Sequence, residues 1–167
     1  MAILTLRPNG ASSANEWTPV GAATAWECTD DVTSDGDTSY ISATSTDLNT
    51  IIALPSTGLA PETTINSITL YSVSRSTSGT QEYYMGVNDS TDNTLVSIEP
   101  NVSTSYVTNS ITETVNPVTS LPFTVTELTG LKIQVYSYTQ PLRITQLYVE
   151  VSYGPGLSTN AILFAGD

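Results

Sequence analysis

The chain has 167 residues, of which 39% are hydrophobic, with a formal net charge of −12, one cysteine and no histidine. Without histidine, neither a Ser-His-Asp or Cys-His nucleophile nor a four-ligand Cys/His zinc site can be built from this chain alone. The acidic balance repels phosphate backbones and anionic lipid, so we expect no nucleic-acid partner and no membrane partner. A lone cysteine cannot form an intramolecular disulfide, and Cys28 is predicted to be a small buried apolar side chain.

Turn signals divide the chain into short segments of strand-like composition. In chain order, the nine predicted strands cover residues 3–7, 39–43, 49–54, 67–75, 81–88, 94–99, 106–115, 131–137 and 142–153. The last segment alternates most regularly, with Leu147, Val149, Val151 and Tyr153 on one face and Gln146, Tyr148, Glu150 and Ser152 on the other. The one helical turn expected lies at 126–129, where Thr126 would cap and Glu127 would sit at the positive end.

Short strands at this spacing, without a sustained helical period, predict an all-β fold. We expect an antiparallel β-sandwich, jelly-roll-like, as a single domain over residues 1–154 with a C-terminal arm at 155–167. A globule of this size buries roughly 70% of the surface that its unfolded chain exposes, so it needs no disulfide or metal to fold.

A cluster of carboxylates precedes the second predicted strand. Asp31, Asp35 and Asp37, with backbone carbonyls, could supply most of the six to eight oxygen ligands that calcium takes. Their spacing departs from the EF-hand loop, and the alternative is an Asx-rich turn in which the aspartates accept their own downstream amides. A calcium site and an Asx turn are both open at this stage, and no other cofactor is expected.

Exposed tyrosines and a hydrophobic tail are the candidate contact surfaces. Tyr136 and Tyr148 fall on the polar faces of their strands and are the better interface candidates, whereas Trp17, Trp26 and Tyr153 are expected in the core. The segment from Ala161 to Ala165 is unusually apolar for a chain end. Further predicted contact residues are Ile3, Leu4, Ile162, Leu163 and Phe164, with the arm either adding a strand to a neighbour or folding back on its own domain.

The acidic residues give no enzyme signature. A glycosidase needs two carboxylates about 5 to 9.5 Å apart in a cleft, and sixteen acids make such pairs unavoidable. Glu82, Glu99, Glu113 and Glu150 are predicted to point outward from their strands, where they protect sheet edges and keep the surface soluble. We therefore expect a binding protein and no enzyme.

Several motifs, in this order and spacing, resemble a β-sandwich domain of tailed-bacteriophage virion proteins. They are residues 6–10 (LRPNG), 30–41 (DDVTSDGDTSYI), 64–75 (TINSITLYSVSR), 116–119 (NPVT), 123–133 (FTVTELTGLKI) and 143–153 (RITQLYVEVSY). The resemblance implies a jelly-roll-like virion domain of the capsid decoration or appendage type. It brings no catalytic residues with it.

The main functional hypothesis is a phage capsid decoration or cement protein that binds the outer head surface and stabilises the shell through protein–protein contacts. Its expected partners are the major capsid protein and copies of itself, as a trimer or dimer, after synthesis in the host cytoplasm without a signal peptide. The alternative is a tail- or head-fibre module that binds host cell-surface polysaccharide through exposed aromatic side chains and Asp-lined loops. A third hypothesis, an extracellular filament subunit, is disfavoured because the chain shows no signal peptide.

Overall fold

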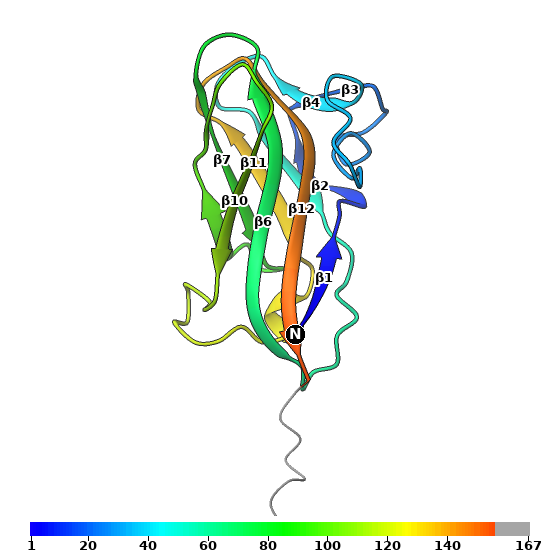
Figure 1. The fold of residues 1–167 in the computed structure, drawn as a ribbon, viewed down its shortest axis with the longest axis vertical. Helices are drawn as coiled ribbons and strands as arrows, with labels where there is room; N and C mark the ends of the chain where they lie inside the picture. The colour runs from blue at the N-terminus through cyan, green and yellow to red at the C-terminus, as the bar shows by residue number, and fades with distance from the viewer. Residues whose placement is uncertain (156–167) are drawn as a thin grey trace, which may run out of the picture.

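The computed structural model describes residues 1–155, which form twelve β-strands and one 3-10 helix. The strands lie in two antiparallel sheets packed face to face (Figure 1). This arrangement confirms the all-β, jelly-roll-like sandwich expected from the sequence. No helix of residues 1–155 is long and apolar enough to cross a membrane. Apart from Pro155, the predicted arm lies outside the described residues.

Each sheet contains six strands. Sheet A has the order β10-β6-β12-β4-β3, with β1 also paired to β12. Its strands are β1 (Ala2–Leu6), β3 (Thr18–Val20), β4 (Tyr40–Ala43), β6 (Thr64–Ser76), β10 (Val107–Glu113) and β12 (Leu142–Gly154). Sheet B has the order β2-β5-β11-β7-β8, with β9 also paired to β7. Its strands are β2 (Gly10–Asn15), β5 (Asn49–Ala53), β7 (Gln81–Asn88), β8 (Thr94–Ile98), β9 (Asn101–Val102) and β11 (Lys132–Ser137).

The two longest strands, β6 and β12, run side by side along the whole molecule (Figure 1). The other edge of β12 is shared, because β4 pairs with its first residues and β1 pairs with its last ones. The register of β12 shifts at Thr145, between these two partners. The amino terminus consequently lies beside the end of β12 (Figure 1).

The core between the sheets is built by the period-two alternation of the strands. In β12, Leu147, Val149 and Val151 are fully buried, as the sequence predicts. Cys28 is also fully buried and free, which confirms its prediction as an apolar core residue. Trp17 is 1% exposed, and its indole Nε1 donates to the Leu48 carbonyl oxygen at 3.0 Å.

A buried tyrosine connects the two sheets through the core. Tyr83 of β7 is fully buried, and its hydroxyl lies 2.7 Å from Ser72 Oγ and 3.0 Å from Ser74 Oγ on β6. The Trp17 ring packs edge-on against it, with ring centroids 6.4 Å apart. Because a buried hydroxyl without partners is costly, this pairing fixes the register of β7 against sheet A.

The sequence missed β2, β3 and β9, which are short and lack an alternating apolar pattern. Residues 10–15 read Gly-Ala-Ser-Ser-Ala-Asn and form a strand because they pair with β5. The expected helical turn exists as the 3-10 helix Thr126–Leu128, but Thr126 does not cap it. The N-cap residue is Val125, whose side chain makes no capping bond. Just before it, the Glu127 backbone N–H donates to Thr124 Oγ1 at 3.4 Å and the Thr124 backbone N–H donates to the Glu127 carboxylate at 2.7 Å, the reciprocal pattern of a capping box.

Tyr83→Phe should lower the free energy of unfolding by about 1–3 kcal/mol, because it leaves the Ser72 hydroxyl buried without its partner. Urea denaturation followed by tryptophan fluorescence would measure this. The matched control is Tyr84→Phe on the half-exposed neighbouring position, where we expect a change within about 0.5 kcal/mol. Equal stabilities of the Tyr83→Phe and Tyr84→Phe variants would contradict a structural role for the Tyr83 hydroxyl.

Candidate functional site

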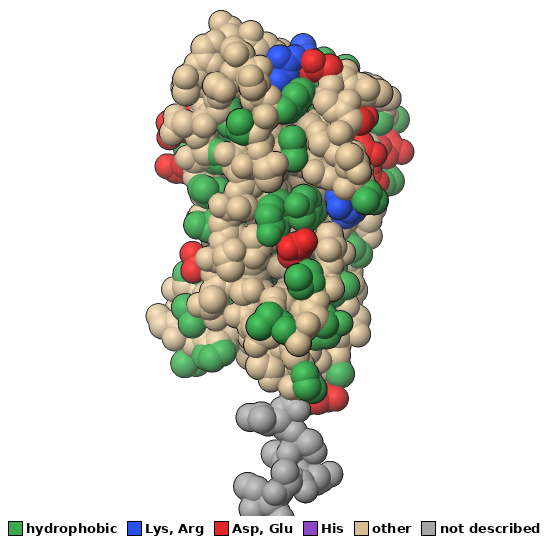
Figure 2. Space-filling model, viewed as in Figure 1, with side chains coloured by type: hydrophobic (Ala, Val, Ile, Leu, Met, Phe, Trp, Pro, Cys, Tyr) green, Lys and Arg blue, Asp and Glu red, His purple; other side chains and the backbone are tan. Residues whose placement is uncertain are grey.

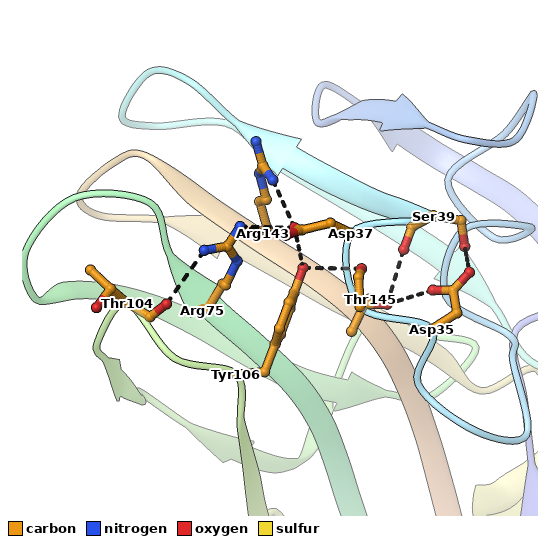
Figure 3. Close-up of polar contacts among 9 residues, drawn as sticks. Asp35, Asp37, Ser39, Arg75, Thr104, Tyr106, Arg143 and Thr145 are labelled. Carbon is orange, nitrogen blue, oxygen red and sulfur yellow. Dashed lines mark hydrogen bonds and ion pairs between the residues drawn. The ribbon is translucent and has the colours of Figure 1, made fainter.

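The acidic loop between β3 and β4 is held against sheet A by a cluster of charged side chains (Figure 3). Asp37 accepts hydrogen bonds from Arg75 of β6 at 2.7 and 2.9 Å and from Arg143 of β12 at 2.7 Å. The Tyr106 hydroxyl lies 2.9 Å from the same carboxylate, and its ring lies 5.1 Å from the Arg75 guanidinium. We call Asp37, Arg75, Arg143 and Tyr106 the arginine clamp.

The groups of the arginine clamp keep fixed charge states near neutral pH. Hydrogen bonding by Arg75, followed by that of Arg143 and Tyr106, outweighs desolvation and lowers the pKa of Asp37 to about 2. Burial and the Asp37 carboxylate raise the pKa of Tyr106 to about 12. Neither group titrates near neutral pH, so the cluster is suited to holding the loop and unsuited to general acid–base catalysis.

The other two predicted calcium ligands of the loop have different partners, and calcium binding stays a prediction. The Asp35 carboxylate lies 2.9 Å from Thr145 Oγ1 and 3.1 Å from Ser39 Oγ (Figure 3). The Asp31 carboxylate lies 3.4 Å from Ser39 Oγ. Within residues 1–155, no group of three or more His, Cys, Asp or Glu side chains is arranged to hold a metal ion. Of the three predicted ligands, Asp37 is paired with the two arginines, whereas Asp31 and Asp35 share the Ser39 hydroxyl.

The loop fills the part of the β12 edge that β1 and β4 leave open. The Leu147 amide donates to the Thr29 carbonyl oxygen at 2.9 Å, and Gln146 Nε2 donates to the Asp31 carbonyl oxygen at 2.6 Å. Thr145 Oγ1, at the register shift, lies 2.9 Å from the Ser39 carbonyl oxygen. Backbone groups of an edge strand must be paired when they are covered, so the acidic segment serves the fold.

The outer face of sheet A has aromatic side chains, but these are already in contact with one another. Tyr148 stacks on Tyr71 with ring centroids 4.5 Å apart and an interplanar angle of 10°. The Arg7 guanidinium lies 4.9 Å from the centroid of the Tyr148 ring. Figure 2 shows this side of the molecule, where hydrophobic side chains are scattered over a largely uncharged polar surface. Tyr148, a predicted interface residue, is therefore engaged by its own chain.

The outer face of sheet B presents a tyrosine differently. Tyr84 and Gly86 point to the same side of β7, and the Tyr84 ring lies across Gly86. A Cβ added to Gly86 would fall 2.9 Å from the Tyr84 Cζ atom, so only glycine leaves this space open to the ring. Among residues 1–155, no aromatic ring stacks on Tyr84. The phenol end of Tyr84 thus lies close to the Gly86 backbone, and the Tyr84 side chain is half-buried.

Two further tyrosines extend this surface. Tyr136, the other predicted interface residue, lies opposite Tyr84 in the register, and its ring meets Tyr138 edge-on with centroids 5.5 Å apart. The Tyr136 hydroxyl donates to Asp47 at 2.7 Å, and the Tyr138 hydroxyl donates to Glu99 at 2.8 Å. Hydrogen bonding to Glu99 raises the pKa of Tyr138 to about 12. Both phenols are neutral and held in place over the physiological range.

A row of side-chain amides crosses three strands beside these tyrosines. Asn88 Nδ2 of β7 donates to Gln134 Oε1 of β11 at 3.2 Å, and Gln134 Nε2 donates to Asn49 Oδ1 of β5 at 3.0 Å. Gln134 lies opposite Gly86 in the register, so the amide row borders the Tyr84 ring. We call the surface formed by Tyr84, Tyr136, Tyr138, Gln134 and Asn49 the tyrosine face.

The remaining predicted site residues are spread over the molecule. Ile3 is 64% exposed on β1, whereas Leu4 is half-buried and packs against the core. Glu113 and Glu150 belong to sheet A, whereas Glu82 belongs to β7 and Glu99 follows β8 in sheet B. The predicted contacts of Ile162, Leu163 and Phe164 lie outside the described residues.

Comparison with known proteins gives fold likeness only. No protein-family model matches the sequence, and no curated protein matches it. Among solved structures, the CBM22-1 xylan-binding domain of Xyn10C from Paenibacillus barcinonensis superposes with a TM-score of 0.46 at 11% identity, over 89% of this chain and 92% of that one. The CBM1 domain of BiXyn10A gives a TM-score of 0.45 at 8% identity, over 92% of this chain and 91% of that one.

A virion protein is also among the similar structures. The enzymatically active domain of tailspike protein 4 from bacteriophage CBA120 gives a TM-score of 0.45 at 11% identity, over 90% of this chain and 19% of that one. At such scores and identities these likenesses carry no argument about function. The resemblance to phage virion domains stays a prediction beyond the β-sandwich itself.

Asp37→Asn should reduce the loss of thermal stability that the protein shows as the pH falls below about 4. The carboxyl pKa is about 2 in the folded protein and about 3.9 in an unfolded chain. A depressed folded-state pKa contributes stability above the unfolded value, and that contribution is lost as the pH falls from about 4 to 2. Because the Asp37 side chain is 52% exposed, screening limits the expected Tm difference at pH 7 to about 3 °C or less.

Thermal unfolding at a series of pH values would compare Asp37→Asn with wild type. Glu62→Gln, an exposed carboxylate in the β5–β6 loop, is the charge-matched control and should follow the wild-type curve. Parallel curves for Asp37→Asn and wild type below pH 4 would show that the arginine clamp does not contribute to stability.

Proposed function

We propose that this chain is a non-catalytic polysaccharide-binding module whose tyrosine face receives the glycan. In this proposal the domain acts as part of a phage fibre or head appendage that binds a host cell-surface polysaccharide. The observation that carries the proposal is the half-buried Tyr84 ring, whose phenol end lies over Gly86 and on which no other aromatic ring of residues 1–155 stacks.

A flat aromatic ring suits the apolar side of a sugar ring. A pyranose carries axial C–H bonds on its faces, and the electron-rich face of a phenol attracts such weakly positive hydrogens. Tyr84 needs no rearrangement to present its ring, because Gly86 has no side chain to occupy the space where the ring lies. A binding surface that is already formed loses little conformational entropy when the ligand arrives.

The amides beside Tyr84 suit the polar rim of a sugar. A hydroxyl group both donates and accepts, and a side-chain amide supplies one acceptor and two donors. Asn88 donates a hydrogen bond to Gln134, and Gln134 donates one to Asn49. These two bonds hold the side-chain amides in a fixed orientation. The tyrosine face therefore offers stacking and hydrogen bonding within one rigid sheet, which supports glycan binding without any catalytic group.

Tyr84→Ala should weaken glycan binding about tenfold or more, because it removes the stacking platform. Affinity electrophoresis in gels that contain candidate host polysaccharides, followed by isothermal titration calorimetry on any that retard the protein, would measure the loss. Gly86→Ala should weaken the same binding by displacing the ring. Tyr71→Ala, on the outer face of sheet A, is the matched control and should bind like wild type. An equal loss of glycan affinity in Tyr71→Ala would contradict binding at the tyrosine face of sheet B.

A second proposal, favoured by a different observation, is assembly on the outer capsid surface. Among residues 1–155, β12 is the only strand that pairs with β1, and Ile3 on that edge strand is 64% exposed. An open edge with an exposed β-branched residue can accept a strand from another chain. A decoration protein bound to the major capsid protein, or to copies of itself, would use this edge.

Ile3→Lys should abolish such assembly, because a lysine on an edge strand opposes pairing with a further strand. Sedimentation velocity would show a wild-type oligomer and a monomeric variant. Val118→Lys, at a loop position that is 58% exposed, is the control and should stay oligomeric. A monomeric wild-type protein that fails to co-sediment with the phage head would reject the capsid proposal.

A further inference from the structure

The tyrosine face has an uncharged centre and negatively charged surroundings. Its centre, formed by Tyr84, Gln134 and Asn49, carries no charge. Carboxylates surround this centre on several sides. They belong to Glu16, which accepts from the backbone N–H of Asn49, to Asp47 and Glu99, which accept from tyrosine hydroxyls, and to Glu82 on β7. The nearby cation of sheet B, Lys132, is paired with Asp92.

Asp47 and Glu99 are placed to meet a ligand as well as a tyrosine. Each lies in an exposed position and accepts one phenol hydrogen bond, at 2.7 Å for Asp47 and 2.8 Å for Glu99, and Asp47 also accepts from the Thr46 hydroxyl at 3.2 Å. A carboxylate has about four lone-pair sites, so at least half of the accepting capacity of each remains. The tyrosine hydroxyls hold the two carboxylates in a fixed orientation before a ligand arrives.

This pattern selects a ligand by charge. A sugar hydroxyl donates a strong, charge-assisted hydrogen bond to a carboxylate, whereas a uronate, sulfate or sialate group is repelled by it. The net charge of −12 adds to this repulsion at low salt. The same carboxylates attract a cationic glycan, so the cationic class is separated from the uncharged class by a chitosan probe.

We propose that the polysaccharide bound by the tyrosine face is uncharged, and that Asp47 and Glu99 accept hydrogen bonds from its hydroxyl groups while excluding anionic chains. This inference rests on the proposed polysaccharide-binding function and adds the substrate class and two specificity-determining residues. Hydrogen bonding between uncharged hydroxyls and fixed carboxylates depends weakly on ionic strength, which separates it from steering by net charge.

The test is affinity electrophoresis and calorimetry of the full chain against three groups of polysaccharides. The neutral group comprises dextran, a mixed-linkage β-glucan, a galactomannan and a mannan. The anionic group comprises alginate, heparin and polysialic acid, and chitosan is the cationic probe. We expect binding to at least one neutral chain, with a dissociation constant that changes by about twofold or less between low and high salt, and no binding to the anionic group.

Two conservative variants test the named residues. Glu99→Gln and Asp47→Asn keep an acceptor for the tyrosine hydroxyl but remove the charge, so each should weaken neutral binding about threefold to tenfold. The double variant should gain measurable binding to an anionic chain at low salt. Glu113→Gln, which removes one charge from β10 of sheet A, is the matched control and should change neither property.

The outcomes separate this inference from the function on which it rests. Binding only to anionic chains or only to chitosan, lost in Tyr84→Ala, would overturn the uncharged ligand and keep the polysaccharide-binding function. Neutral binding that is unaffected by Glu99→Gln and Asp47→Asn would overturn the role of these carboxylates. No binding to any member of the three groups would overturn the polysaccharide-binding function and the inference together.

Discussion

The position of the Tyr83 hydroxyl between Ser72 and Ser74 is the constraint on which the rest of the sandwich depends. A fully buried phenol that reaches across the core leaves β7 no freedom to slip, because a shift by one residue would turn Tyr84 into the core and Tyr83 out of it. The alternation of β7 then places Tyr84 on the outside of sheet B. An interaction in the core thereby decides which ring is offered to solvent.

The second constraint is the shared edge of β12. A strand of thirteen residues has β6 along one side, but its other side is divided between β4, the acidic loop and β1. The loop can fill this gap only if its charges are compensated, and the arginine clamp compensates Asp37 while Thr145 meets Asp35. The densest group of acids in the sequence is therefore used for folding, and its chemistry is directed at its own chain.

The sequence predicts strands better than it predicts sites, for a physical reason. The alternation from Leu147 to Val151 depends on neighbours two residues apart, so it can be read locally, and the structure confirms it. The clamp cannot be read in this way, because Arg75 and Arg143 lie 38 and 106 residues from Asp37. The tyrosine face needs cross-strand register as well. A signal was present in Tyr84-Met85-Gly86, where a glycine two residues from an outward tyrosine leaves room for its ring, but the pairing with Gln134 could not be inferred.

The two outer faces of the sandwich use the same residue types in opposite ways. On sheet A, Tyr148 is stacked on Tyr71 and covered by Arg7, and Tyr40 lies 4.3 Å from the Arg143 guanidinium. On sheet A, arginine guanidinium groups therefore cover the faces of these aromatic rings. Sheet B has a lysine that is paired with Asp92, and its tyrosine hydroxyls donate to carboxylates while the Tyr84 ring rests on backbone. With its arginines beside sheet A and the sheet-B cation Lys132 paired with Asp92, the molecule can offer an uncharged polar ligand a stacking surface on sheet B without an unpaired cation beside it.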